Sequence, residues 1–245
     1  MTELDSGLSS TRRDRVLWLA FDRPRAGNAV TADVAAAFSQ ALAAAGKDSD
    51  ISAVVLTGAG GKIFSAGIDV KNPHDLAHEA LAASRRGAVE QCMAAILDFD
   101  KPLIGAVNGY AIGLGFMLAL LTDRVIASDN AQFSLSEIDI NIPTFLGISI
   151  VGRAGGIALA RDLVLTGRRM NAAEAQARAL IGVVVPAAQL TATAQAAALE
   201  LAAKPRAAFA LDKQWLARGL KEEFAAANAR SATVQKMLAA GSFSH

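Results

Sequence analysis

Unbroken apolar runs predict several short strands along the chain. Such runs are typical of strands covered on both faces, because a strand with one face in water alternates apolar and polar residues. The run at 132–142 differs because it alternates, with Glu137, Asp139 and Asn141 on one face and isoleucines on the other. The predicted strands lie at residues 15–22, 51–57, 103–107, 124–127, 132–142 and 183–186.

Apolar residues at helical spacing predict the other elements. Thr31 is a suitable N-cap for one helix, and Gly46 ends it. Asn171, with Glu174 three residues later, has the capping-box arrangement of another helix start. The remaining predicted helices lie at about 75–97, after Gly113, and, rich in alanine, from residue 187 onwards.

The alternation of strands and helices predicts an α/β fold. The chain has 245 residues, of which 53% are hydrophobic, and this suffices for one compact core or for a core with a smaller appendage. The last fifty or so residues are purely helical in pattern. We therefore expect an α/β core over residues 1–190 and a helical region over residues 191–245.

Composition and charge argue against several classes of partner. The formal charge of +1 leaves no basic surplus for the phosphates of a nucleic acid. Cys92 is the single cysteine, which precludes an internal disulfide and fits a reducing, cytoplasmic compartment. The nearly uncharged stretch 103–122 has the length of a membrane span, but Asn108 and Gly109 interrupt it. We expect neither a nucleic-acid nor a membrane partner.

Two motifs that suggest ligands are incomplete. Residues 54–61, VVLTGAGG, contain two glycines of the dinucleotide-binding fingerprint, but Ile63 occupies the position of the last glycine. His74 and His78 would share one helix face, as paired metal ligands do, but no third ligand is evident. We therefore predict neither a dinucleotide site nor a metal site.

Two glycine-bearing segments could direct backbone N–H groups at one oxygen atom. Gly113-Leu114-Gly115 begins an apolar helix, whose first amides lack partners and carry partial positive charge. The loop at 64–69 offers a second set of amides beside a glycine. Together they would form an oxyanion hole for a carbonyl oxygen that becomes an enolate. Tight turns packed in a core would explain the same residues.

The alternating run supplies candidate acids. Glu137 and Asp139 would lie beside apolar surface, where the pKa of a carboxyl group rises and proton transfer at carbon becomes feasible. The local pattern does not distinguish the two acids. A strand edge facing solvent would fit both equally well.

Four segments follow one another along the chain, namely VVLTGAGGKIFSAGIDVK, KPLIGAVNGYAIGLG, TDRVIASDNAQFSLSE and LVLTGRRMNAAEAQARALIGVV. In order and spacing they resemble the enoyl-CoA hydratase/isomerase (crotonase) family, and the similarity runs from about Val16 to Pro186. The resemblance implies a spiral of ββα units and an acyl-CoA thioester substrate. It implies no separate cofactor, since coenzyme A is part of the substrate. It also implies that the C-terminal helices assemble a homotrimer, often as a dimer of trimers.

The resemblance implies roles for individual residues. The backbone amides of Ile68 and Leu114 match the family's oxyanion hole, and Glu137 matches a catalytic glutamate. Among the expected substrate contacts, the family places Ala66 near the adenine of coenzyme A and the basic positions near its phosphates. The expected contacts with substrate or coenzyme A are Arg25, Ala66, Lys71, Gly113 and Met117.

Met117 departs from the family pattern, because hydratases that use two glutamates carry one of them at this position. Adding water is well served by two carboxylates, whereas moving a double bond needs one base that takes a proton from C2 and returns it at C4. We therefore expect Δ3–Δ2 enoyl-CoA isomerisation by Glu137. Hydration by Glu137 alone is the close alternative, and His74, Asp75 or Asp139 are candidates for an assisting group. A binding protein for acyl-CoA without turnover is the alternative of another class.

Overall fold

The computed structural model describes residues 2–4, 6–70 and 79–239 of the chain. Within them, the larger of two sheets has seven strands, which are, from edge to edge, β1 (Thr2–Leu4), β2 (Leu8–Arg13), β3 (Val16–Phe21), β4 (Ala53–Gly58), β6 (Leu103–Val107), β8 (Arg124–Ser128) and β11 (Val183–Val185). The first three strands pair antiparallel, whereas every pair from β3 to β11 is parallel. Parallel neighbours need long crossover connections, which the helices supply.

A second sheet has four short strands, which are, in order, β10 (Met170–Asn171), β9 (Gln132–Ser134), β7 (Tyr110–Ile112) and β5 (Ile63–Ser65). The neighbours β5, β7 and β9 are parallel. Each of them is the next strand in the chain after one of the larger sheet, namely β4, β6 or β8, and each is followed by helical structure. This repeat is the spiral of ββα units that the family resemblance implies.

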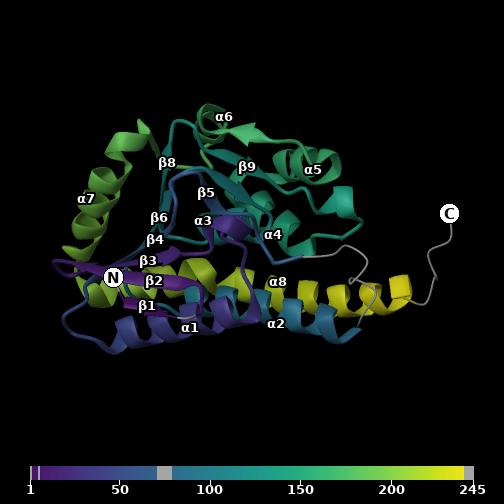
Figure 1. Cartoon of the computed structure of the whole chain (residues 1–245), viewed down its shortest axis with the longest axis horizontal. Helices are drawn as coiled ribbons and strands as arrows, with labels where there is room; N and C mark the ends of the chain where they lie inside the picture. Colours follow the sequence, from purple (N-terminus) through teal and green to yellow (C-terminus); the bar gives the residue numbers. More distant parts are fainter. Residues whose placement is uncertain (1, 5, 71–78, 240–245) are drawn as a thin grey trace.

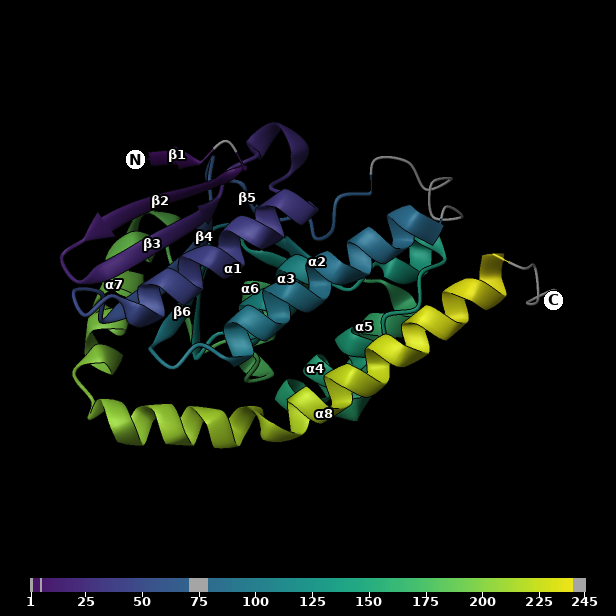
Figure 2. The ribbon, with the colours of Figure 1, turned by 90° about the horizontal axis from the view of Figure 1, so that it is seen from below.

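Helices cover both faces of the larger sheet. The described α-helices are α1 (Ala32–Lys47), α2 (Glu79–Leu97), α3 (Leu114–Leu120), α4 (Phe145–Gly155), α5 (Ile157–Thr166), α6 (Ala172–Ala177), α7 (Leu190–Ala202) and α8 (Arg206–Ala239). Short 3-10 helices are η1 (Pro24–Ala26), η3 (Glu137–Ile140) and η4 (Ala187–Gln189). α7 stands apart from the other helices (Figure 1), while α1, α2 and the second half of α8 run alongside one another (Figure 2).

Alternate residues of the parallel strands pack against different layers. On one face, Val54, Leu56 and Leu103 join a core with side chains of α1, α2 and α3. On the other face, Val55 and Ile104 pack with alanines of α7. Because both faces are covered, neither side of these strands can be polar, and this explains the unbroken apolar runs of the sequence.

Two predicted helix starts are confirmed. At the start of α1, the Thr31 side chain accepts a hydrogen bond from the amide of Val34 at 3.2 Å. At the start of α6, Asn171 Oδ1 accepts one from the amide of Glu174 at 2.8 Å. The Glu174 carboxylate is engaged differently from the predicted capping box, because it accepts hydrogen bonds from Arg168.

The predicted strand at 132–142 is wrong beyond its first three residues. β9 ends at Ser134, since neither neighbouring strand, β7 or β10, continues further to pair with it. The backbone then satisfies its hydrogen bonds locally, as in the bond of 3.1 Å from the Asn141 amide to the Ile138 oxygen. The two acids that the alternation placed on one strand face lie instead on the helical turn η3.

The C-terminal helices contact the rest of the chain in different ways. α7 packs on the larger sheet, whereas α8 packs along α2 and α4. The division into a core over 1–190 and a helical region over 191–245 stays a prediction. Of the predicted helix at 75–97, residues 75–78 lie outside the described residues. No helix in the described part of the chain combines the length and apolar character of a membrane span.

Candidate active site

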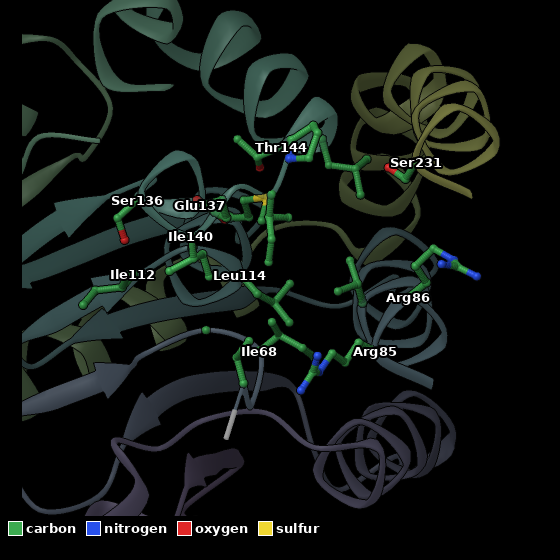
Figure 3. Close-up of a pocket in the computed structure, with 18 of the residues that line it drawn as sticks. Ile68, Arg85, Arg86, Ile112, Leu114, Ser136, Glu137, Ile140, Thr144 and Ser231 are labelled. Atoms are coloured by element: carbon green, nitrogen blue, oxygen red, sulfur yellow. The ribbon is translucent and has the colours of Figure 1, made fainter. Parts of the chain in front are cut away.

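A cavity of about 730 Å³ lies where three strands of the smaller sheet end (Figure 3). Because β5, β7 and β9 are parallel neighbours, the segments that follow them meet at one edge of the sheet. Residues from 66–70, 112–114 and 136–146 therefore line the cavity together. Side chains of α2 and α8 line it as well.

Glu137 is a wall residue at the start of η3. Its Oε2 atom is buried and has no hydrogen-bond partner among the described residues. Its Oε1 atom lies against Gly113, where an added Cβ atom would come within 3.0 Å of it. Burial raises the pKa of Glu137 to about 7, although a hydrogen bond with its own backbone opposes the rise. The carboxyl group can therefore gain and lose a proton near neutral pH.

Among the described residues, the backbone N–H groups of Ile68 and Leu114 donate no hydrogen bond to the backbone of another helix, strand or loop. Ile68 forms a parallel bridge with Val30, and the bonds of that bridge run through its two chain neighbours, so the N–H of Ile68 faces the other way. Gly67 lies against the start of α3, where an added Cβ atom would be 3.2 Å from the Leu114 nitrogen. Ile68 and Leu114 both line the cavity, so their two N–H groups are candidate donors to one acceptor there.

Glycine is required at the start of α3. Gly113 has a φ of +55°, which other residues adopt only with strain. Its amide donates to the oxygen of Ser134 at 2.9 Å, which ties the start of α3 to the end of β9. Gly115 allows α3 to lie directly against Ser65 of β5. These contacts hold the Leu114 amide close to the ends of β5 and β9.

Met117 is buried in α3 and lines the cavity. The acids among the described lining residues are Asp69 and Glu137. The Asp69 carboxylate accepts a hydrogen bond from Arg23 at 2.8 Å, so its charge is already balanced. Among the described residues of the wall, Glu137 is therefore the carboxyl group without a cationic partner.

The other predicted site residues differ in whether they line the cavity. Ala66 is exposed and lines the cavity, as Gly113 does. Arg25 is exposed on η1 and is not part of the lining, although its neighbour Ala26 is. Asp139 is exposed and lies against Gly167, outside the lining. Four predicted positions lie outside the described residues, namely Lys71, His74, Asp75 and His78.

The sequence indicates that the 72–90 segment sets the depth of the pocket, but it identified neither the individual lining residues of α2 nor any of α8. Arg85 and Arg86 of α2, and Asn228 and Ser231 of α8, belong to the lining. Two adjacent arginines within a helix that otherwise packs on the core were an available signal. No local pattern marks the α8 residues, because their position depends on where the C-terminal helix packs.

The family model for enoyl-CoA hydratase/isomerase matches residues 11–242 of the chain. The 2,3-dehydroadipyl-CoA hydratase of Escherichia coli K12 is 40% identical over 182 residues, which cover 74% of this chain and 70% of that protein. The carnitinyl-CoA dehydratase of Salmonella enteritidis PT4 is 35% identical over 199 residues, which cover 81% of this chain and 75% of that protein. Both relatives therefore match most of their own length.

The fold agrees with these matches. The crystal structure of an enoyl-CoA hydratase from Mycobacterium avium subsp. paratuberculosis K-10 superposes with a TM-score of 0.83 at 28% identity. The superposition covers 97% of this chain and 95% of that one, so it extends from the sheets to the C-terminal helices. The match of the family model, the identity to its members and the shared fold lead to one conclusion: this chain is an acyl-CoA enzyme that belongs to the enoyl-CoA hydratase/isomerase family.

Proposed function

We propose that the cavity binds an enoyl-CoA thioester and that Glu137 moves a proton between two of its carbon atoms. The amides of Ile68 and Leu114 bind the thioester oxygen and stabilise the negative charge that it carries as an enolate. The observation that carries this proposal is the buried Oε2 of Glu137, which has no hydrogen-bond partner in the described part of the chain and belongs to the same cavity as the two amides.

The reaction that this geometry supports best is the shift of a double bond from the 3 to the 2 position. The Glu137 carboxylate removes a proton from C2 of a 3-enoyl-CoA, and the electron pair of that C–H bond moves into the thioester to give a dienolate. The resulting carboxylic acid then returns the proton at C4, and the double bond forms between C2 and C3. A pKa of about 7 suits both steps, because the group must be a base first and an acid afterwards.

Met117 favours isomerisation over the addition of water. Its thioether offers an apolar wall, and a water molecule held for attack needs polar partners. Asp69, the other described acid of the lining, is bound to Arg23 and is not free to act as a second base. One base suffices for moving a proton from C2 to C4 of the same substrate.

Hydration of a 2-enoyl-CoA is the second candidate, and the names of the relatives favour it. One is named 2,3-dehydroadipyl-CoA hydratase and the other carnitinyl-CoA dehydratase. In this reaction Glu137 would take a proton from water as the oxygen adds to C3, and would then give a proton to C2. A single carboxyl group would serve as base and acid in turn.

One experiment separates these candidates. The protein is incubated in deuterated water with a 2-enoyl-CoA and, separately, with a 3-enoyl-CoA, and the products are followed by mass and by ultraviolet absorbance. A shifted double bond supports isomerisation, with deuterium at C4 wherever Glu137 exchanges its proton with solvent, and gain of one water mass supports hydration. Binding of both substrates without either product would contradict both and support an acyl-CoA binding protein instead.

The coenzyme A part of the substrate has candidate contacts beside the cavity. We propose that Ala66, which is exposed at the lining, contacts the adenine. Arg25 is exposed one residue before the lining residue Ala26 and can reach a phosphate from η1. Lys71 is proposed as a second phosphate contact on the family resemblance alone.

We also propose that the chain assembles as a homotrimer or as a dimer of trimers. Supporting this, α8 exposes three large apolar side chains, which a monomer would leave in water. They are Leu211, Trp215 and Leu216, whose exposed fractions are 66%, 70% and 79%.

A further inference from the structure

Arg85 of α2 carries a positive charge into the cavity wall without an acidic partner among the described residues. Its Nη1 atom is buried and has no hydrogen-bond partner among the residues that the structure describes. Its Nε donates to the backbone oxygen of Asp69 at 3.2 Å, and this fixes the direction of the side chain. Figure 3 shows Arg85 extending from α2 toward Ile68, whereas the neighbouring Arg86 points away from the other labelled residues. A buried guanidinium N–H without an acceptor is costly, so an acceptor is expected from a ligand.

The carboxylates of the described lining do not supply this acceptor. Asp69 offers Arg85 only its backbone oxygen, because its carboxylate is bound to Arg23. Glu137 forms no ion pair in the described part of the chain. Val70 and Val89, which are apolar, belong to the same cavity lining as Arg85. An anion brought into this place would meet a fixed positive charge in a partly dehydrated setting, where charge-assisted hydrogen bonds are strong.

The place of Arg85 in the cavity indicates which part of the substrate it contacts. This step rests on the proposed function. With the thioester oxygen at the amides of Ile68 and Leu114, and the adenine of coenzyme A at the exposed Ala66, the wall that remains for the acyl group includes Arg85 and Val89 of α2. The hydrogen bond from Arg85 to the Asp69 oxygen holds the guanidinium in this part of the wall. We propose that Arg85 binds a carboxylate at the far end of the acyl group, and that the substrate is the monothioester of a dicarboxylic acid with coenzyme A.

Binding measurements with unreactive substrates test this without requiring turnover. The ligands are saturated CoA monothioesters of linear dicarboxylic acids of increasing length, each beside its methyl ester, and calorimetry gives their dissociation constants. At the best length, the free carboxylate is expected to bind about 10- to 100-fold more tightly than the ester. Equal affinity at every length would overturn the proposal.

Variants assign the preference to Arg85. Arg85→Gln is expected to remove the difference between acid and ester while leaving the affinity for the ester nearly unchanged, and Arg85→Lys to keep part of it. Arg86→Gln, at the adjacent position with the side chain turned away, is the matched control and should keep the full preference. If Arg85→Gln instead weakened acid, ester and free coenzyme A equally, Arg85 would serve the coenzyme A phosphates or the fold, and the proposal would be wrong.

The outcome is separable from that of the proposed reaction. Loss of turnover on every enoyl-CoA together with a carboxylate preference that depends on Arg85 would refute the proposed chemistry and keep the carboxylate site. Turnover of uncharged enoyl-CoA without any carboxylate preference would do the reverse. Melting temperatures of the variants confirm that each one is folded before its dissociation constants are compared.

Discussion

At the scale of the residue, Glu137 is the group on which the proposed chemistry depends. Glu137→Gln keeps the size of the side chain but removes the base, so kcat is expected to fall by about 10²- to 10⁴-fold. Because the carboxyl group lies against Gly113 and forms no ion pair with a described residue, the substitution should leave the fold and acyl-CoA binding intact. Steady-state kinetics beside calorimetric binding measure both effects. Full turnover by the variant would show that another group is the base.

The burial of Glu137 predicts how the rate depends on pH. Its pKa is raised to about 7, so the fraction present as carboxylate grows as the pH rises through 7. The kcat/KM of wild-type protein is therefore expected to rise between about pH 6 and pH 8 and then to level off. An ordinary carboxyl group would already be ionised at pH 6, so a rate that is flat over this range would contradict the assigned base.

At the scale of the element, Leu114 at the start of α3 contributes in two separate ways. Its backbone N–H is the proposed oxyanion contact, and its side chain packs in the core. Leu114→Pro removes the N–H at the first position of a helix, where proline is tolerated. Leu114→Ala is the matched control, because it removes the buried side chain but keeps the N–H. We expect kcat of the proline variant to be about 10²- to 10³-fold below that of the alanine variant.

The comparison between the two variants isolates the oxyanion contact. Both lose the packing of Leu114, so both are expected to melt at a lower temperature than wild type. The kinetic comparison is made at a temperature where circular dichroism shows each variant folded. Equal kcat values for the two would mean that the Leu114 amide does not stabilise the transition state.

Some helix and strand boundaries could be predicted from the sequence, and others could not. Helix starts at Thr31 and Asn171 were predictable because the side chain and the amide that it binds are three residues apart. The buried strands were predictable because coverage on both faces leaves unbroken apolar runs. The end of β9 at Ser134 was not predictable, because a strand continues only where a neighbour offers hydrogen bonds, and the neighbours are distant in sequence.

At the scale of the whole molecule, the candidate site depends on three separate chain segments meeting. Ile68, Leu114 and Glu137 each follow a strand of the smaller sheet, and the sequence resemblance identified all three. Local patterns alone placed Glu137 on a strand and did not separate it from Asp139. The contribution of Arg85 was missed because it depends on the packing of α2 over the ends of these strands. A family motif thus locates the residues that are proposed to act on the thioester, whereas the part of the lining that α2 and α8 supply depends on the packing of the fold.

The exposed apolar side chains of α8 lead to a prediction about assembly. Leu211 and Trp215 are one helical turn apart, so they share a face of α8 that is largely exposed, although the Arg218 guanidinium lies over the Trp215 ring. Burial of such a face between subunits is favourable in proportion to the apolar area removed from water.

Sedimentation equilibrium of wild-type protein is expected to give a mass that is a multiple of three chains. The double substitution Leu211→Glu and Trp215→Glu should lower that mass, whereas Gln214→Glu, which adds charge at an exposed polar position of the same helix, should leave it unchanged. A monomeric wild type would refute the assembly, and an unchanged mass for the double variant would assign the interface to another surface.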